Sequence, residues 1–221
     1  YEDYIIGVND DGNDIIFTSD PSKLADYFGN NPDAPHYLTP VFFRREVLQK
    51  YYNNPNKYSV GLDEFDEPNI IKCGNLWCLD IDNESSDYVS VYLGDLGEKL
   101  PYNEQKYWKT YNIAIDGKLS EAKIKRDFLS EFTPSENPIS IFKNKYKKTN
   151  QNFENKLGFP LFLPLHEKDK YKLSGLRIPH SDTQKDFDEQ IISLTVILIE
   201  SLNKIFFKKT LPNYSEQEDL K

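Results

Sequence analysis

Two aspartates stand at alternate positions where an apolar run ends. Asp80 and Asp82 flank Ile81, and two further acids, Glu84 and Asp87, follow closely. Alternate residues of a strand point to the same face, so the two aspartates would lie side by side, and carboxylate oxygens suit Mg²⁺. Asp and Asn are also ordinary turn formers, and the glycine-containing pattern of a calcium loop is absent. We favour a polar turn and keep a Mg²⁺ site as the alternative.

A Glu-x-Lys spacing further along the chain resembles half of a metal-dependent nuclease motif. Glu121 and Lys123 have this spacing, and in such a motif acids hold Mg²⁺ while the lysine polarises the attacking water. The partner acid should lie on an adjacent strand, but Glu121 opens a predicted helix. Glu154 and Lys156 repeat the same spacing. We therefore favour exposed charges on helix faces and retain Asp80, Asp82, Glu121 and Lys123 as candidate catalytic residues only in the alternative.

One histidine precedes a pair of arginines in an aromatic segment. His36 opens the segment, and Arg44 and Arg45 close it. A histidine beside two arginines suits an anionic ligand. A hydrogen-bonded histidine at the end of a strand is the simpler interpretation, so these three residues remain candidate ligand-binding residues.

One basic patch contains aromatic side chains at helical spacing. Its candidate nucleic-acid contacts are Lys143, Lys145, Tyr146, Lys147 and Lys148. Cations interleaved with aromatic rings bind single-stranded nucleic acid by stacking and phosphate contact. The same pattern is typical of an amphipathic helix with a solvated lysine face, which we favour.

Metal and cofactor signals are otherwise weak. Cys73 and Cys78 are five apart, and the three histidines are far apart in sequence, whereas a zinc site needs four ligands, commonly in closely spaced pairs. We expect both thiols to be small core residues and predict no bound metal. The sequence contains no phosphate-binding loop, dinucleotide fingerprint or nucleophile elbow, so we predict no cofactor, with Mg²⁺ reserved for the phosphodiesterase or nuclease alternative.

The elements that would position these residues indicate an α+β fold. Alternation and turn signals predict an antiparallel sheet between residues 4 and 94, and helical periodicity predicts a mostly helical second half. Residues 1–100 would form a β meander with two helices, and residues 101–221 would pack on it in one compact domain. The expected strands are 4–8, 15–18, 36–43, 70–73, 76–81 and 88–93; the expected helices are 21–28, 44–54, 102–111, 120–132, 139–157 and 182–207; and 159–165 is a packed loop or short strand.

The predicted final helix is apolar around nearly its whole circumference from Ile191 to Phe207. A helix of this kind is buried, either within this chain or against a flanking domain or protein partner. Glu200, Asn203 and Lys204 interrupt the run, so it is too short and polar for a membrane span.

Charge divides the chain into two halves. Residues 1–100 carry 7 basic and 19 acidic side chains, and residues 101–221 carry 20 and 17. An acidic half repels phosphate backbones, so we do not expect the chain to be a dedicated nucleic-acid-binding protein.

Two cysteines in 221 residues do not form a disulfide framework, and we expect a cytoplasmic location. The chain starts at Tyr1, without Met and close to a predicted strand, and it ends at Lys221 after an acidic stretch. We therefore expect it to be a piece of a longer protein.

Several segments together resemble a family of long bacterial proteins that has no assigned activity. The resemblance covers most of residues 36–205 and is carried by HYLTPVFF (36–43), GNLW (74–77), LGDLG (93–97), YWKTYNI (107–113), LGFPLF (157–162), LRIP (176–179) and FDEQ (187–190). It implies that the chain continues beyond the last helix, and it implies no catalytic residues.

Two functional hypotheses follow. The first is a non-catalytic recognition or regulatory module of a larger bacterial protein, which binds its neighbours through the final helix. The second is a Mg²⁺-dependent phosphodiesterase or nuclease, with single-strand binding by residues 143–156 as a further alternative.

Overall fold

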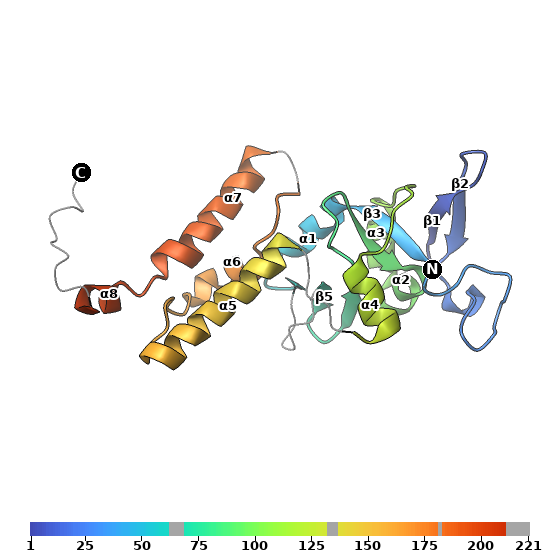
Figure 1. The fold of residues 1–221 in the computed structure, drawn as a ribbon. Helices are drawn as coiled ribbons and strands as arrows, with labels where there is room; N and C mark the ends of the chain where they lie inside the picture. The colour runs from blue at the N-terminus through green and yellow to red at the C-terminus, as the bar shows by residue number, and fades with distance from the viewer. Residues whose placement is uncertain (62–68, 132–136, 181–182, 211–221) are drawn as a thin grey trace. The chain divides into compact units, whose positions relative to one another are not determined.

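A computed structural model describes residues 1–61, 69–131, 137–180 and 183–210. For residues 208–210 it describes the backbone without the side chains. The chain forms two compact units: the first comprises residues 1–141 and 180–182, and the second comprises residues 142–179 and 183–221. Each unit is described by itself below (Figure 1). The antiparallel sheets occupy the N-terminal half and most helices the C-terminal half, so the predicted α+β class is confirmed.

The first unit contains all seven described strands and four of the helices. The strands are β1 (Asp3–Val8), β2 (Asp14–Thr18), β3 (Pro40–Arg44), β4 (Ser59–Gly61), β5 (Ile70–Cys73), β6 (Trp77–Asp80) and β7 (Tyr88–Tyr92). The helices are α1 (Gln49–Tyr52), α2 (Leu93–Lys99), α3 (Tyr102–Lys109) and α4 (Glu121–Leu129), with 3₁₀ turns at Pro21–Lys23 and Arg45–Leu48.

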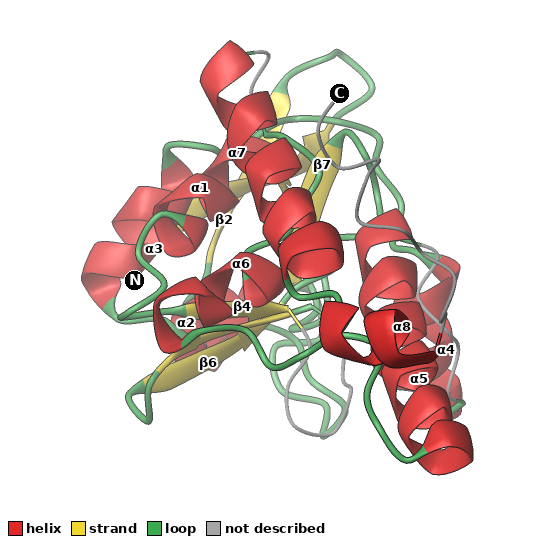
Figure 2. Ribbon diagram, turned by 90° about the vertical axis from the view of Figure 1, so that its left-hand side faces the viewer, coloured by secondary structure: helices red, strands yellow, loops and turns green. Residues whose placement is uncertain are grey.

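The strands pair in three small antiparallel sheets rather than in one meander. β1 pairs with β2 around Gly12 at φ 82°, as the hairpin prediction requires. β5 joins β4 and β6, but β7 pairs with β3, and Figure 2 shows β7 apart from β4 and β6. The predicted continuation from β6 to β7 was therefore wrong. A single bridge between Asp82 and Ser90 remains of it.

Aromatic side chains from distant segments fill the core of the first unit. Phe43 on β3 meets Tyr4 and Trp108 edge to face, with ring centroids 5.8 and 4.8 Å apart. Tyr51 on α1 is also fully buried beside Trp108. Edge-to-face pairs of this kind add stabilisation beyond their buried area, which explains how a chain without methionine builds a dense core.

Helix α2 was not predicted. It begins directly after β7 and carries Gly94 and Gly97, two residues that disfavour helices. The structure explains both glycines, because a Cβ at Gly97 would lie 1.8 Å from the carbonyl oxygen of Ser19, and one at Gly94 would lie 2.2 Å from the ring of Tyr37. The glycines allow the backbone of α2 to approach its neighbours closely.

Several predicted helices are shorter than expected. Only a 3₁₀ turn forms where residues 21–28 were expected to be helical, although Asp20 caps it as predicted. Residues 44–54 form a 3₁₀ turn followed by α1. Helix α4 ends at Leu129 because Ser130 adopts a left-handed conformation. The expected end of this helix at residue 132 lies outside the described residues.

The second unit is helical. Its elements are most of α5 (Pro138–Leu157), a 3₁₀ turn at Glu167–Asp169, α6 (Lys170–Ser174), α7 (Gln184–Thr195), a π-helical turn at Val196–Glu200 and α8 (Lys204–Thr210). The prediction for α5 is confirmed within one residue. The single helix expected over residues 182–207 was wrong, because the chain leaves the helix at Ser201 and bridges Leu202 to Phe162 before α8 begins. No helix in the described ranges has the length and apolarity that a membrane crossing demands.

Candidate functional site

Asp80 and Lys123 are brought together, as part of a network of ion pairs. The ammonium of Lys123 lies 2.9 Å from Asp80 and 3.0 Å from Asp127, and Arg126 lies 3.3 Å from Asp80. Lys123 is 2% exposed and lies 4.6 Å from the ring centre of Tyr92. The two cations therefore compensate the carboxylate of Asp80, which holds α4 against the end of β6.

Asp82 is buried and fastens the beginning of α4. Its carboxylate accepts a hydrogen bond from the backbone N–H of Ser120 at 2.7 Å. The hydroxyl of Ser120 in turn accepts from the N–H of Lys123 at 3.0 Å and caps the helix. Burial raises the pKa of Asp82, although the hydrogen bonds from Ser120 act in the opposite direction.

Glu121 lies apart from these acids. It pairs with Lys125 on the surface of α4, whereas Lys123 is buried. Residues two apart on an α-helix point in nearly opposite directions, so Glu121 and Lys123 do not form the predicted motif. Across the residues that the structure describes, no three His, Cys, Asp or Glu side chains gather as a metal site, and the Mg²⁺ alternative lacks its third acid.

Glu84 makes the same kind of attachment as the two aspartates. It accepts hydrogen bonds from the backbone N–H of Asn137 at 2.7 Å and from the amide of Asn69 at 3.0 Å. Asn137 caps α5 by accepting from the N–H of Ile139 at 2.9 Å. The acids at 80, 82 and 84 therefore attach α4 and the start of α5 to the sheet.

Replacement of Asp82 by asparagine separates an anchoring role from a catalytic one. The amide oxygen still accepts from Ser120, and the cost of burying a charge disappears. Because the folded state holds the Asp82 proton more strongly than the unfolded state, ionisation lowers stability as pH rises above the usual aspartate pKa. We expect Asp82→Asn to be at least as stable as the unsubstituted protein at pH 7. Its free energy of unfolding, measured with urea, should also change less with pH above the usual aspartate pKa.

Asp82→Ala is the matched variant, because it removes the acceptor as well as the charge. The uncapped N–H should cost about 1–2 kcal/mol. Equal stability losses for the asparagine and alanine variants at pH 7 would contradict the anchoring role.

His36, Arg44 and Arg45 have three different partners. The imidazole of His36 accepts from the N–H of Leu38 at 3.1 Å, which is the interpretation that we favoured from the sequence. Arg44 donates to the carbonyl oxygen of Thr110 at 3.1 Å. Arg45 is buried and donates to the carbonyl oxygen of Ser85. Binding of an anionic ligand by these three residues stays a prediction.

The basic helix does not offer its aromatic rings to a nucleic acid. Tyr146 stacks on Phe162 with ring centroids 4.8 Å apart and packs beside Phe142 at 6.2 Å. Lys143 donates to the carbonyl oxygen of Ser174 at 2.8 Å, and burial lowers its pKa to about 8.

The remaining candidate lysines, Lys145, Lys147 and Lys148, are exposed. They form the solvated face expected of an amphipathic helix, and single-strand binding by residues 143–156 stays a prediction.

The two cysteines differ from expectation in one respect. Cys73 is buried in the core as expected, but Cys78 is exposed. They lie on paired strands, where Cys73 faces Trp77 and Cys78 faces Lys72, so the one-residue offset sends Cys78 to the solvent side.

A buried polar cluster around Glu104 was missed. Its carboxylate accepts hydrogen bonds from Lys50 at 2.7 Å and Tyr51 at 2.8 Å, and the indole N–H of Trp108 donates to the Tyr51 hydroxyl at 2.7 Å. The ammonium of Lys50 also lies 4.4 Å from the ring centre of Tyr107. The spacing of Glu104 and Trp108, four apart on one helix face, was the available signal. The cluster ties α1 to α3.

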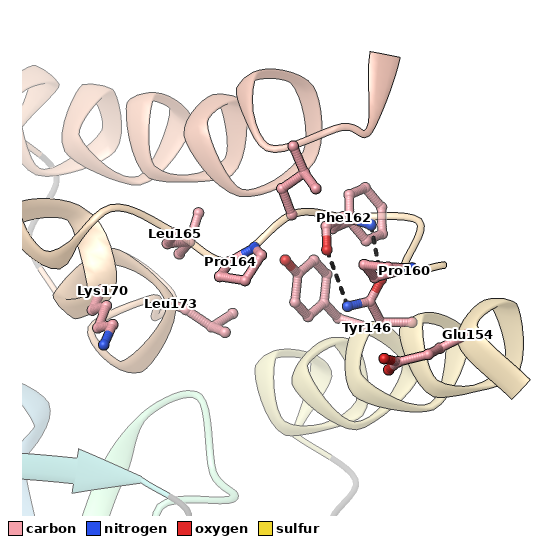
Figure 3. A pocket seen from close by; sticks show the side chains of 10 residues that line it. Tyr146, Glu154, Pro160, Phe162, Pro164, Leu165, Lys170 and Leu173 are labelled. Atoms are coloured by element: carbon pink, nitrogen blue, oxygen red, sulfur yellow. Dashed lines mark hydrogen bonds between the residues drawn. The ribbon is translucent and has the colours of Figure 1, made fainter. Parts of the chain in front are cut away.

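The second unit contains an open groove of about 360 Å³ between α5, the segment 160–165 and α6. Tyr146 and Phe162 form its aromatic wall, with Leu165 and Leu173 opposite (Figure 3). Glu154 and Lys170 lie at its two ends in this view. The sequence showed only an apolar segment with two prolines here, without the groove.

Comparisons with protein-family models, curated proteins and solved structures found no match for this chain. Functional interpretation therefore depends on the geometry of its own residues.

Helix α7 turns two of its polar residues inward. Asp186 is 5% exposed and binds Arg177 at 2.7 Å, and Gln190, 6% exposed, accepts from the backbone N–H of Arg177 at 3.0 Å. The apolar side chains of Ile192 and Ile199 are 54% and 57% exposed. An ordinary amphipathic helix buries its apolar residues and exposes its polar ones, so these four positions depart from that pattern. Among the large apolar residues of 191–207, Val196 and Ile197 are buried within this chain; burial of the others against a flanking domain or a partner stays a prediction.

The π-helical turn aligns the exposed apolar residues in a row. In an α-helix, steps of four residues drift steadily around the axis, because a turn holds 3.6 residues. A π turn holds more residues and reverses this drift after Thr195. Ile199 therefore returns to the row that contains Ile191 and Thr195. Four exposed apolar residues of α7 and of the π-helical turn that follows it, Phe187, Ile191, Ile192 and Ile199, are called the α7 apolar face.

Proposed function

We propose that the chain is a non-catalytic recognition module, located in the cytoplasm, that binds a protein surface through the α7 apolar face. One observation carries the proposal: α7 buries Asp186 and Gln190, while Ile192 on α7 and Ile199 in the following π-helical turn are exposed. Exposed apolar residues gathered on one face mark interaction sites more often than single ones do. The surface that covers them belongs to a partner protein or to a flanking domain.

The internal contacts of α7 support a rigid binding surface. The ion pair between Arg177 and Asp186 is buried on both sides, and Ile197 is fully buried. These contacts fix the rotation of the helix, so the apolar face does not turn inward. A preorganised face loses little conformational entropy when it binds.

Photo-crosslinking tests the proposal directly. A benzophenone amino acid at position 192, in full-length protein in cells of the source organism, should form covalent adducts through the α7 apolar face. We expect Ile199→Asp to reduce these adducts at least fivefold, because a carboxylate in an apolar interface loses its hydration. The measurement is mass spectrometry of the cross-linked peptides.

The same amino acid at position 102 is the control, since Tyr102 is a half-exposed aromatic residue of the first unit. Cross-links within one chain would identify a flanking domain, and cross-links to another polypeptide would identify a partner. A yield at 192 no higher than at 102, or one unchanged by Ile199→Asp, would refute the proposal.

A further inference from the structure

The hairpin of β1 and β2 leaves the outer edge of β2 without a partner strand. On its inner side, β1 is joined to β3 through Asn112. The side chain of Asn112 accepts from the N–H of Ile5 at 2.6 Å and donates to the carbonyl oxygens of Ile5 and Phe42 at 3.1 and 3.0 Å. β2 lies on the other side of β1 (Figure 1), and among the described strands it pairs with β1 alone.

The backbone groups of Ile16 point to this open edge. Opposite residues of an antiparallel pair either bond to each other or both turn their N–H and C=O groups to the outer sides of the pair. Ile5 lies opposite Ile16, and its N–H and C=O bind Asn112. Ile16 therefore turns its own N–H and C=O outward, and by alternation Asp14 and Thr18 do the same.

The side chains of β2 suit an added strand. Ile15 and Ile16 are exposed, as is Val8 on β1. β2 contains neither lysine nor proline, two residues that protect edge strands from pairing, and the bulge of this hairpin lies on β1. The base of the hairpin is fixed, because Tyr4 is buried in the core and Phe17 packs against it. An incoming strand meets a rigid edge with apolar side chains.

The charge of the hairpin determines which strand fits. Residues 1–18 carry five acidic side chains and no basic one. Four of the acids are exposed and form no ion pair with another described residue: Asp3, Asp10, Asp11 and Asp14. Like charges that face one another across paired strands are destabilising. Two copies of this edge therefore repel each other, whereas an incoming strand with lysines is attracted.

We propose that the open edge of β2 binds an extended segment of a partner protein in which lysines alternate with β-branched residues. The segment adds a strand to the hairpin by bonding to the backbone of Asp14, Ile16 and Thr18, a known mode of peptide recognition. Its lysines lie near the four exposed aspartates. This edge belongs to the first unit and the α7 apolar face to the second, so the two surfaces serve separate interactions.

Three capped octapeptides test the proposal by NMR titration of the ¹⁵N-labelled intact chain. They are the basic KVTVKVTK, the neutral QVTVQVTQ and the acidic EVTVEVTE. We expect the basic peptide to bind about three- to tenfold more tightly than the neutral one, as a few exposed ion pairs allow, and the acidic peptide to bind most weakly. At saturation with the basic peptide, the amide proton of Ile16 should exchange with water at least about fivefold more slowly.

Ile16→Lys places a charge on the edge without removing a bond between β1 and β2. It should abolish binding of the basic and the neutral peptide alike. Leu76→Lys is the matched control, because Leu76 is an exposed aliphatic residue in the turn between β5 and β6 of another sheet, and it should leave all three affinities unchanged. The amide spectrum verifies the fold of each variant.

Asp14→Asn separates the charge from the edge. It should reduce the preference for the basic over the neutral peptide about twofold and leave the affinity of the neutral peptide unchanged. An Ile16 amide that is not protected by the basic peptide would overturn the proposal, and so would equal binding of the basic and acidic peptides. A dimer in sedimentation that dissociates in Ile16→Lys would assign the edge to a second copy and overturn it as well.

Discussion

Replacing Glu104 by alanine is expected to lower the free energy of unfolding of the first unit by about 2–4 kcal/mol. The carboxylate accepts from Tyr51, whose side chain is fully buried, so the substitution leaves a core hydroxyl without its acceptor. It also removes the counterion of Lys50. Lys50 is 30% exposed in its side chain and can turn to water, so most of the loss comes from Tyr51.

Urea unfolding followed by tryptophan fluorescence measures this loss specifically. Both tryptophans of the chain, Trp77 and Trp108, belong to the first unit, and Trp108 donates to Tyr51. The control is Glu121→Ala, which removes an exposed acid from α4 and should change stability by less than about 0.5 kcal/mol. Equal effects of the two substitutions would show that the Glu104 cluster contributes nothing beyond a surface ion pair.

Replacing Gly97 by alanine is expected to be at least as harmful, with a loss of about 3 kcal/mol or more. The new Cβ would lie 1.8 Å from the backbone carbonyl oxygen of Ser19. A backbone atom cannot move aside as a flexible side chain does, so α2 must shift away from the 3₁₀ turn at Pro21–Lys23. Because α2 is packed against the core, the shift disturbs its buried residues Leu93 and Leu96.

Gly7→Ala provides the matched control for this prediction. Gly7 lies on β1, and its added Cβ meets no atom within 4 Å. The alanine should therefore be neutral in the same thermal or urea unfolding measurement. If Gly97→Ala unfolds at the same urea concentration as Gly7→Ala, the close approach of α2 to Ser19 does not exist in solution.

The sequence predicted helix and strand boundaries correctly where neighbouring residues determine them. Gly12 in the hairpin, the Ser120 cap of α4 and Gly158 after α5 all act within a few residues, and the expected strands and helices begin or end next to them. Helix α2 was not predicted, because its two glycines are required by close contacts with Ser19 and Tyr37, which are far away in sequence. No local rule gives the distance of an approaching backbone.

Helix α4 shows why side-chain type alone does not predict which face of a helix is buried. An amphipathic helix buries its apolar residues, but Ile124 and Phe128 of α4 are 42% and 48% exposed while Lys123 is buried. Two acids, Asp80 and Asp127, compensate the buried ammonium. A tertiary ion pair thus decides the rotation of the helix, against its hydrophobic pattern.

The candidate acids could be located from the sequence, but their role could not. Asp80 and Asp82 do lie close together at the end of β6, as alternation predicts. Their partners, Lys123 and Ser120, come 43 and 38 residues later. Only the folded chain shows that these acids hold helices in place.

The three acids at the end of β6 are synthesised before the groups that they bind. Asp80, Asp82 and Glu84 leave the ribosome 43, 38 and 53 residues before the groups that they bind. At about 5–20 residues per second, this gap lasts roughly 2–10 s. During that time the groups on α4 and the start of α5 that bind these carboxylates have not yet been made, and charged groups without a partner are best accommodated in water.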